Sequence, residues 1–98
     1  MTPPRHIEAR IYFLAAEEGG RRTPALTGYR PQFYFDGMDV DAPHEYPDVD
    51  QVWPGDEVRA FLYFVRPEEH LPKMHAGKEF LLREGARVIG RGVVTKVL

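Results

Sequence analysis

Hydrophobic and polar residues alternate with a period of two near the end of the chain, which is typical of β-strands with one buried face. Within residues 79–98 the alternation is interrupted at residues 84–86, where Gly85 can adopt a positive φ without steric cost. Gly90 and Gly92 lie on one face of the second half and require a bulge, a bend or a close backbone neighbour. The stretch therefore predicts a β-hairpin whose second strand is tightly coiled, as in a small barrel.

The same period predicts further strands earlier in the chain, at residues 6–14, 32–35 with a continuation through Met38 and Val40, 48–52 and 57–65. The last of these is apolar on both faces, which favours a central place in a sheet. Residues 41–48 and 67–77 contain prolines and show no period, which predicts loops. No segment shows a sustained helical period. About six short strands without a helix indicate an all-β barrel or sandwich, and a closed barrel has no exposed edge.

Length and composition are those of an ordinary globular protein. The chain has 98 residues, of which 43% are hydrophobic and 29% charged, and this predicts one domain over residues 1–98 with residues 1–5 as a tail. Cysteine is absent, which excludes disulfides and thiolate chemistry. No apolar run resembles a signal peptide or a membrane span, so we expect a cytoplasmic protein without membrane contact.

The acidic residues are concentrated in one part of the chain. Residues 36–57 hold eight of the 15 acidic residues and no Lys or Arg, so the rest of the chain carries 13 basic residues against seven acidic ones. The overall net charge of -2 argues against nucleic-acid binding by bulk charge alone. This uneven distribution has two possible explanations. The domain has two oppositely charged faces, or its acidic residues simply occupy solvated loops.

Few residues suit catalysis or metal binding. Serine and cysteine are absent, and the paired carboxylates at residues 17–18 and 68–69 lie in predicted loops without an apolar pocket that would raise a pKa. His70 and His75, in the predicted loop at residues 67–77, are the only residues grouped as metal ligands often are. A zinc site needs three or four ligands in fixed geometry, which such a loop seldom provides. We therefore expect no enzyme activity, no metal and no other cofactor.

Most aromatic side chains are expected in the core, since each ring buries a large area and the domain is small. Exposed aromatic residues beside arginine could stack on nucleic-acid bases, and the candidates are Tyr29, Phe33, Tyr34, Phe35, Trp53, Phe61, Tyr63 and Phe64. Among these we expect partial exposure for Tyr29, Trp53 and Tyr63. His6 and His44 are isolated residues near prolines, and we expect both to be surface groups.

Several short motifs follow one another between residues 7 and 98: Glu-Glu-Gly-Gly-Arg at 17–21, Gly-Tyr-Arg-Pro-Gln-Phe-Tyr-Phe at 28–35, Pro-Gly-Asp at 54–56, Arg-Glu-Gly at 83–85, Gly90, Gly-Val-Val at 92–94 and Lys-Val-Leu at 96–98. Their order and spacing resemble those of the C-terminal, third domain of bacterial elongation factor Tu. The resemblance implies a six-stranded antiparallel β-barrel, in agreement with the strand pattern.

In that family the domain follows a GTPase domain and a second barrel, and it contacts the T arm of aminoacyl-tRNA, the GTPase domain and the nucleotide-exchange factor. This sequence has no Gly-x-x-x-x-Gly-Lys-Ser/Thr phosphate loop, so the resemblance implies no nucleotide binding. It does imply RNA contacts by residues that match the family in type or charge, namely Arg21, Gln32, Arg66 and the turn of Arg83, Glu84 and Gly85. Arginines bind phosphates through paired hydrogen bonds, and a turn can donate a backbone N–H.

Other positions depart from the family pattern. Asp36 stands where the family has a basic residue and Asp41 where it has threonine, and two carboxylates facing phosphates would weaken RNA binding. The predicted loop at residues 67–77 is longer than in the family. Glu79 replaces a basic residue, and Arg91 replaces a small one.

Leu81 also replaces a small residue, on the side that faces the GTPase domain in the family. Two hypotheses of function follow. The first is a non-catalytic binding domain that contacts tRNA or other RNA, or a protein of the translation machinery. The alternative is a protein-interaction or regulatory module that has lost RNA binding and uses the surface around Leu81 and Gln32 for a new partner or for self-association.

Overall fold

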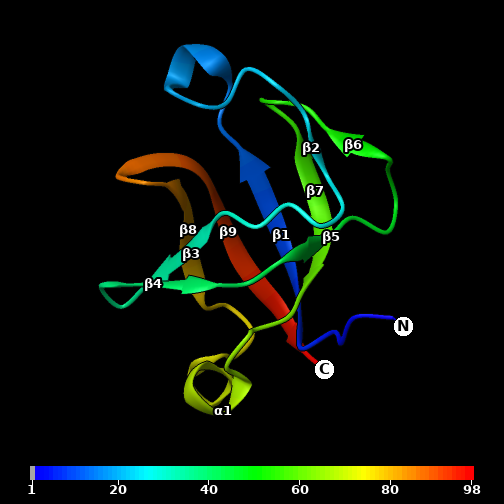
Figure 1. Ribbon diagram of the computed structural model, residues 1–98, viewed down its shortest axis with the longest axis vertical. Helices are drawn as coiled ribbons and strands as arrows, with labels where there is room; N and C mark the ends of the chain where they lie inside the picture. Colours follow the sequence, from blue (N-terminus) through cyan, green and yellow to red (C-terminus); the bar gives the residue numbers. More distant parts are fainter. Residues whose placement is uncertain (1) are drawn as a thin grey trace.

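A computed structural model describes residues 2–98 and shows a curled antiparallel sheet with a few short helical turns (Figure 1). The sheet has the strand order β4-β3-β8-β9-β1-β7-β5, and a separate pair joins β2 to β6. The elements are β1 (Ile7–Phe13), η1 (Ala16–Glu18), β2 (Ala25–Leu26), β3 (Gln32–Phe35), β4 (Met38–Asp41), β5 (His44–Glu45), β6 (Gln51–Val52), β7 (Glu57–Leu62), α1 (Pro67–His70), η2 (Leu71–Lys73), β8 (Glu79–Glu84) and β9 (Arg87–Val97).

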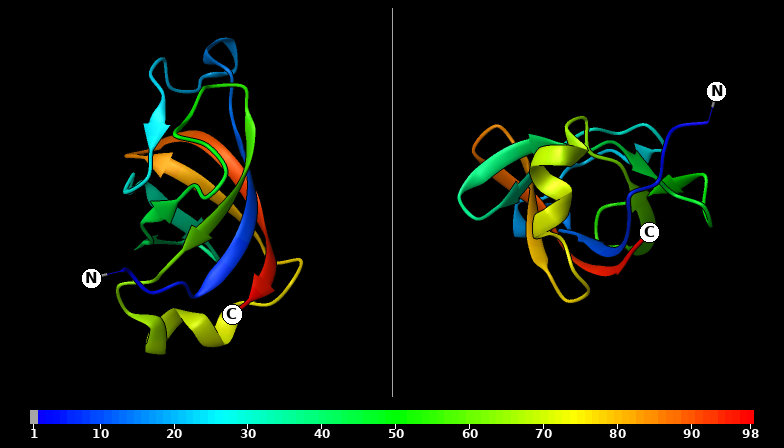
Figure 2. Two further views of the ribbon diagram at one scale, coloured as in Figure 1. Left: turned by 90° about the vertical axis from the view of Figure 1, so that its right-hand side faces the viewer. Right: turned by 90° about the horizontal axis from the view of Figure 1, so that it is seen from below.

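The sheet curls back on itself because the chain runs directly from β4 on one edge to β5 on the other. On the way it meets the end of β7, where the backbone N–H of Val65 donates to Asp41 O and that of Tyr63 donates to Pro43 O, each over 3.4 Å. Seen from below, the strands surround a common interior (Figure 2). The predicted all-β antiparallel barrel is confirmed, although the strands outnumber the six expected.

One extra strand arises at the turn between β3 and β4. Asp36 and Gly37 have φ values of 49° and 78°, the left-handed pair that a two-residue hairpin turn requires. The turn reverses the chain, and Phe35 pairs with Met38. The expectation that Met38 and Val40 continue the aromatic strand is therefore wrong, since they belong to its hairpin partner.

Residues 67–77 hold helical structure where a loop and no helix were predicted. Pro67 begins α1 and Pro72 lies in η2, where the fixed φ of proline suits the start of a helix. These turns have four and three residues, too few to show a helical period in the sequence. Leu71 packs against the core and Met74 is buried, so the segment covers one end of the curled sheet, as the right panel of Figure 2 shows.

The core is formed by the inward faces that the alternation predicts. In β1 every second residue from Ile7 to Phe13 is buried, and the rings of Phe33 and Phe80 stack with centroids 4.2 Å apart. The predicted exceptions are confirmed, since Trp53 is 49% exposed and Tyr29 and Tyr63 are half-buried. Tyr34 and Phe61 are half-buried as well, so the expectation that these two lie in the core is wrong.

Strand β7 lies between β1 and the two-residue strand β5, and its outward face is less buried than the predicted central strand would be. Phe61 is half-buried, and Val65, beyond the end of the strand, is 53% exposed. The inward residues Val58, Ala60 and Leu62 are buried as expected. Strand β7 therefore has one fully apolar face and one mixed face, whereas the sequence predicted two apolar faces.

The glycines of β9 have close neighbours, as their spacing predicts. A Cβ atom on Gly92 would lie 2.4 Å from Cζ of Phe80 and 3.0 Å from the carbonyl oxygen of Arg10. A Cβ atom on Gly90 would lie 3.0 Å from the carbonyl oxygen of Tyr12. The ring of Phe80 thus occupies the space that a side chain at position 92 would need, and the strand can press closely against β1.

The prediction that His6 and His44 are surface groups is wrong. His44 is 1% exposed, with its Nδ1 2.9 Å from the hydroxyl oxygen of Tyr46 and no partner for Nε2 among the described residues. It pairs with Leu62 in the β5–β7 ladder, and such partners point to the same face of a sheet, here the interior. His6 is half-buried, and its Nδ1 accepts a hydrogen bond of 2.9 Å from the backbone N–H of Phe64.

Candidate binding surfaces

The residues expected to contact RNA lie next to one another on one side of the molecule. Gln32 on β3 pairs with Arg83 on β8, and it lines a groove of about 570 Å³ together with Arg66. Arg21, from the loop after η1, places its Nε 3.4 Å from Oε2 of Glu84. These links connect six residues, each to the next, and we call the set the arginine surface: Arg21, Gln32, Arg66, Arg83, Glu84 and Gly85.

Tyr29 and Glu84 hold one end of the arginine surface. The guanidinium of Arg21 lies over the Tyr29 ring at 4.3 Å, and the Tyr29 hydroxyl donates a hydrogen bond of 2.5 Å to Glu84. Burial and this hydrogen bond to a carboxylate raise the pKa of Tyr29 well above its ordinary value. Arg87 also contacts Glu84, over 3.4 Å. Glu84 therefore acts as the shared acceptor that orients Arg21, Tyr29 and Arg87.

Arg83 is held in the middle of the arginine surface. Its Nη2 lies 3.2 Å from Oδ2 of Asp39, its guanidinium lies 4.6 Å from the ring of Tyr34, and its Nε donates to Gly85 O over 3.3 Å. Arg66 is more loosely held, since it is 70% exposed and 3.7 Å from Glu69. Each of the three predicted phosphate-binding arginines thus has a carboxylate beside it.

The two aspartates expected to weaken RNA binding lie in different places. Asp41 pairs with Gln32 on the neighbouring strand and lines the same groove as Arg66. Asp36 lies at the β3–β4 turn, where its carboxylate is 2.8 Å from Nζ of Lys78. Only Asp41 therefore borders the arginine surface.

Asp39 and Arg87 contact the arginine surface and were not foreseen, whereas Tyr29 was expected as a partly exposed aromatic residue that could stack on a base. Asp39 faces Tyr34 across the β3–β4 turn, and the Asp-Gly pair at positions 36 and 37 is the sequence signal from which that register follows. The acidic partner of Arg21, Glu84, comes from a distant segment, whereas its aromatic partner Tyr29 follows it closely in the chain, and no local pattern places the three together.

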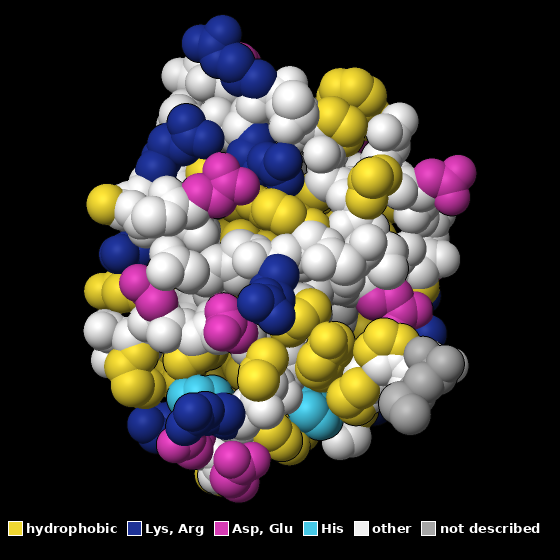
Figure 3. All heavy atoms as spheres, viewed as in Figure 1, with side chains coloured by type: hydrophobic (Ala, Val, Ile, Leu, Met, Phe, Trp, Pro, Cys, Tyr) yellow, Lys and Arg dark blue, Asp and Glu magenta, His cyan; other side chains and the backbone are white. Residues whose placement is uncertain are grey.

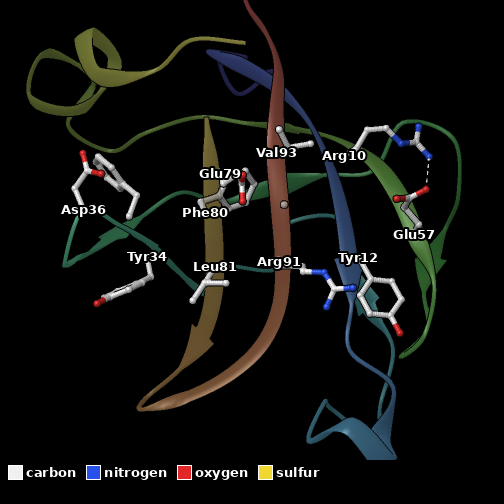
Figure 4. Close-up of a pocket in the computed structure, with 12 residues that line it drawn as sticks. Arg10, Tyr12, Tyr34, Asp36, Glu57, Glu79, Phe80, Leu81, Arg91 and Val93 are labelled. Carbon is white, nitrogen blue, oxygen red and sulfur yellow. Dashed lines mark hydrogen bonds and ion pairs between the residues drawn. The ribbon is translucent and has the colours of Figure 1, made fainter. Parts of the chain in front are cut away.

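Leu81 lies in a different groove, on the outer face of the sheet (Figure 4). This groove has a volume of about 550 Å³ and crosses β3, β8, β9, β1 and β7. One row of cross-strand neighbours runs along it, from Tyr34 through Leu81, Arg91 and Tyr12 to Glu57. We call it the sheet groove. The two residues proposed for a protein interface, Leu81 and Gln32, thus lie in separate grooves.

Acidic and basic side chains are interspersed on the face shown in Figure 3. Of the eight acids in residues 36–57, five lie within 4.0 Å of an Arg or Lys: Asp36, Asp39, Glu45, Asp48 and Glu57. The concentration of acids in the sequence is thus largely balanced in space by bases from other segments.

His70 and His75 do not form a metal cluster. The ring of His70 packs between those of Phe35 and Phe64, with centroids 6.0 and 5.9 Å away, whereas His75 is exposed. Within residues 2–98 no three His, Asp or Glu side chains are placed to hold a metal ion together. In the same part of the chain no helix has the length and hydropathy to cross a membrane.

The comparison with known protein families agrees with the fold and with the motifs. The family described as the elongation factor Tu C-terminal domain matches residues 1–98, which is the whole of this chain. The family match is therefore consistent with the strand pattern in the sequence and with the curled antiparallel sheet of the structure. The chain belongs to the elongation factor Tu C-terminal domain family.

Proposed function

We propose that this protein is a non-catalytic binding domain associated with the translation machinery, and that it binds tRNA or a similarly structured RNA through the arginine surface. The observation that carries the proposal is spatial. Arg21, Gln32, Arg66 and Arg83 come from four segments, and the fold brings them to one side, next to the turn at Gly85. Family membership supports the link with translation.

The arginines would bind phosphates by exchanging one acceptor for another. A phosphate oxygen can replace Asp39 beside Arg83, or Glu84 beside Arg21, because both acceptors are anionic oxygens that suit a guanidinium. The displaced carboxylates then lie near the phosphates and oppose binding. We therefore expect a weak complex whose affinity falls with salt, with a log–log slope of about -2 to -3 for three phosphate contacts.

A substitution that removes one opposing carboxylate is expected to strengthen RNA binding. Asp39→Asn leaves a neutral neighbour beside Arg83, so we expect severalfold tighter binding of tRNA in a fluorescence titration at low salt. Arg83→Gln is expected to weaken binding and to reduce the salt slope by about one. Asp48→Asn is the matched control, because Asp48 is paired with Arg59 on β7, away from the arginine surface.

Two results would contradict RNA binding at this surface. One is the absence of salt-dependent tRNA binding by the wild-type protein at concentrations up to about 100 µM. The other is an equal effect of Asp39→Asn and Asp48→Asn, which would show that only the net charge of the protein matters.

Protein interaction at the sheet groove is a second candidate function. It is favoured by Leu81, a half-buried apolar side chain that lines the groove, with the exposed charges of Glu79 and Arg91 beside it. A tagged wild-type chain is expected to retain a protein partner that the Leu81→Asp chain loses. Recovery of tRNA alone by both chains would count against this function.

A further inference from the structure

Four outward side chains of β8 and β9 form a compact block in the sheet groove. Glu79 pairs with Val93, and Leu81 pairs with Arg91. The two charged residues therefore occupy one diagonal of the block, and the two apolar residues occupy the other, as Figure 4 shows. Cross-strand neighbours of this kind have Cβ atoms about 5 Å apart, so the four side chains form a single contact area.

The two charges of the block are unpaired within residues 2–98. Neighbouring outward arginines have a carboxylate within 4.0 Å, as Arg10 has Glu57. Arg91 instead lies over the Tyr12 ring at 4.6 Å and is exposed, and Glu79 is also exposed. Neither has an ion-pair partner among the described residues. Both remain free to bind groups outside the chain.

We propose that the sheet groove binds a second copy of this chain and forms a two-fold symmetric dimer. The two-fold axis would lie in the interface along the diagonal from Leu81 to Val93. Rotation about that axis places Glu79 of one copy opposite Arg91 of the other, and Arg91 opposite Glu79. Each apolar residue then meets its own counterpart. A two-fold interface must be self-complementary in this way, and the block satisfies that condition.

The charge pattern favours a second copy over other occupants. A polyanion such as RNA would pair with Arg91 and would be repelled by Glu79, and a basic ligand would have the opposite difficulty. A second copy satisfies both charges and covers Leu81 and Val93 at the same time. The second copy is thus the partner in the proposed protein-interaction function, on which the dimer rests, and dimerisation does not depend on RNA binding.

The size of the contact area sets the expected affinity. A contact centred on four side chains is expected to bury less than about 1,200 Å², the lower end of the range for stable complexes. We therefore expect a weak dimer that forms at high micromolar concentrations and dissociates on dilution. Its two ion pairs lie at the edges of the apolar contact, so added salt is expected to shift the equilibrium toward monomer.

Charge reversal tests the pairing directly by sedimentation equilibrium over concentrations up to about 1 mM. Glu79→Arg and Arg91→Glu are each expected to abolish the dimer, because each places like charges opposite one another. An equimolar mixture of the two variants is expected to dimerise again. In a dimer of one Glu79→Arg chain and one Arg91→Glu chain, positions 79 and 91 again carry opposite charges at both contacts. The double variant is expected to dimerise as the wild type does.

Two further variants serve as controls for charge. Asp50→Arg and Arg30→Glu make the same charge changes at exposed residues that do not line the groove, and are expected to leave the dimer intact. Thermal unfolding of each variant establishes that it is folded. Leu81→Asn is expected to abolish the dimer in every combination, while its tRNA affinity stays unchanged because the substitution adds no charge beside Tyr34 and Arg83.

The proposal is overturned if the wild-type chain is monomeric at every concentration, or if the single reversals dimerise as well as the wild type. It is also overturned if the single reversals are monomeric and remain so when mixed. In each case the tRNA titration of the same samples reports separately on the arginine surface, so failure of the dimer and failure of RNA binding are distinguishable.

Discussion

Replacing Gly20 with alanine is expected to destabilise the protein by about 2–4 kcal/mol, the range of substitutions that overpack a core or strain the backbone. A Cβ atom at this position would lie 1.9 Å from the carbonyl oxygen of Leu14 and 2.9 Å from that of Ala15. Both are backbone atoms, so no side-chain rotation can relieve the clash. The backbone N–H of Gly20 also donates to Ala15 O over 3.0 Å. Urea denaturation measures the loss in the free energy of unfolding.

Gly85→Ala is the matched control for the clash at Gly20. Gly85 has φ of 62°, and a Cβ atom there would have no neighbour within 4 Å, so alanine meets only the cost of a left-handed backbone, about 1–2 kcal/mol. We expect Gly20→Ala to be clearly the more destabilising of the two. Equal losses would mean that the turn after η1 can open to admit a side chain.

The protein is expected to lose stability as the pH falls below about 6.5, because of His44. Burial lowers the pKa of the His44 imidazole to about 3 in the folded state, against an ordinary value of about 6.5 in the unfolded chain. Between these values the unfolded state binds a proton that the folded state excludes. The free energy of unfolding is therefore highest above pH 6.5 and decreases by about 1.4 kcal/mol per pH unit below it.

Between pH 7 and pH 5 this effect gives an expected loss of about 2 kcal/mol. Carboxylates whose pKa is lowered by hydrogen bonds from arginine, such as Glu45 and Asp48, lose that stabilisation only at lower pH, where the unfolded carboxyls begin to bind protons. Urea denaturation at several pH values is expected to give a steep slope for the wild type and a flat one for His44→Phe.

Two further measurements keep the assignment to His44 testable. His75→Gln alters an exposed histidine and is expected to leave the slope unchanged. NMR of the folded wild-type protein at pH 5 is expected to show a neutral His44 ring. A charged ring at that pH would contradict the account even if His44→Phe did not fold.

The long strands could be predicted from the sequence because burial imposes a period of two that persists over several residues. Strand β1 and the β8–β9 hairpin are the clearest cases. Strand β5 has only two residues, so it shows no period, and the burial of His44 could not be foreseen from its neighbours. The four-residue helix α1 escaped prediction for the same reason.

The arginine surface was predictable only in part. The family resemblance indicated its arginines, but their ion pairs depend on strand register and on long-range packing. Asp39 reaches Arg83 because β4 folds back on β3 and β8 pairs with β3 on its other edge. Glu84 reaches Arg21 and Tyr29 across separations of more than fifty residues in the chain, and such contacts leave no local pattern.

Phe80 and Gly92 occupy one shared volume, since the ring of the first fills the place of a side chain on the second. A side chain larger than glycine at position 92 therefore requires a smaller residue than phenylalanine at position 80. A relative with a larger residue at the position of Gly92 should carry a smaller one at the position of Phe80, and its sheet would remain equally well packed. The combined size of the two residues is thus limited, and we expect these positions to covary among relatives that keep the same interior.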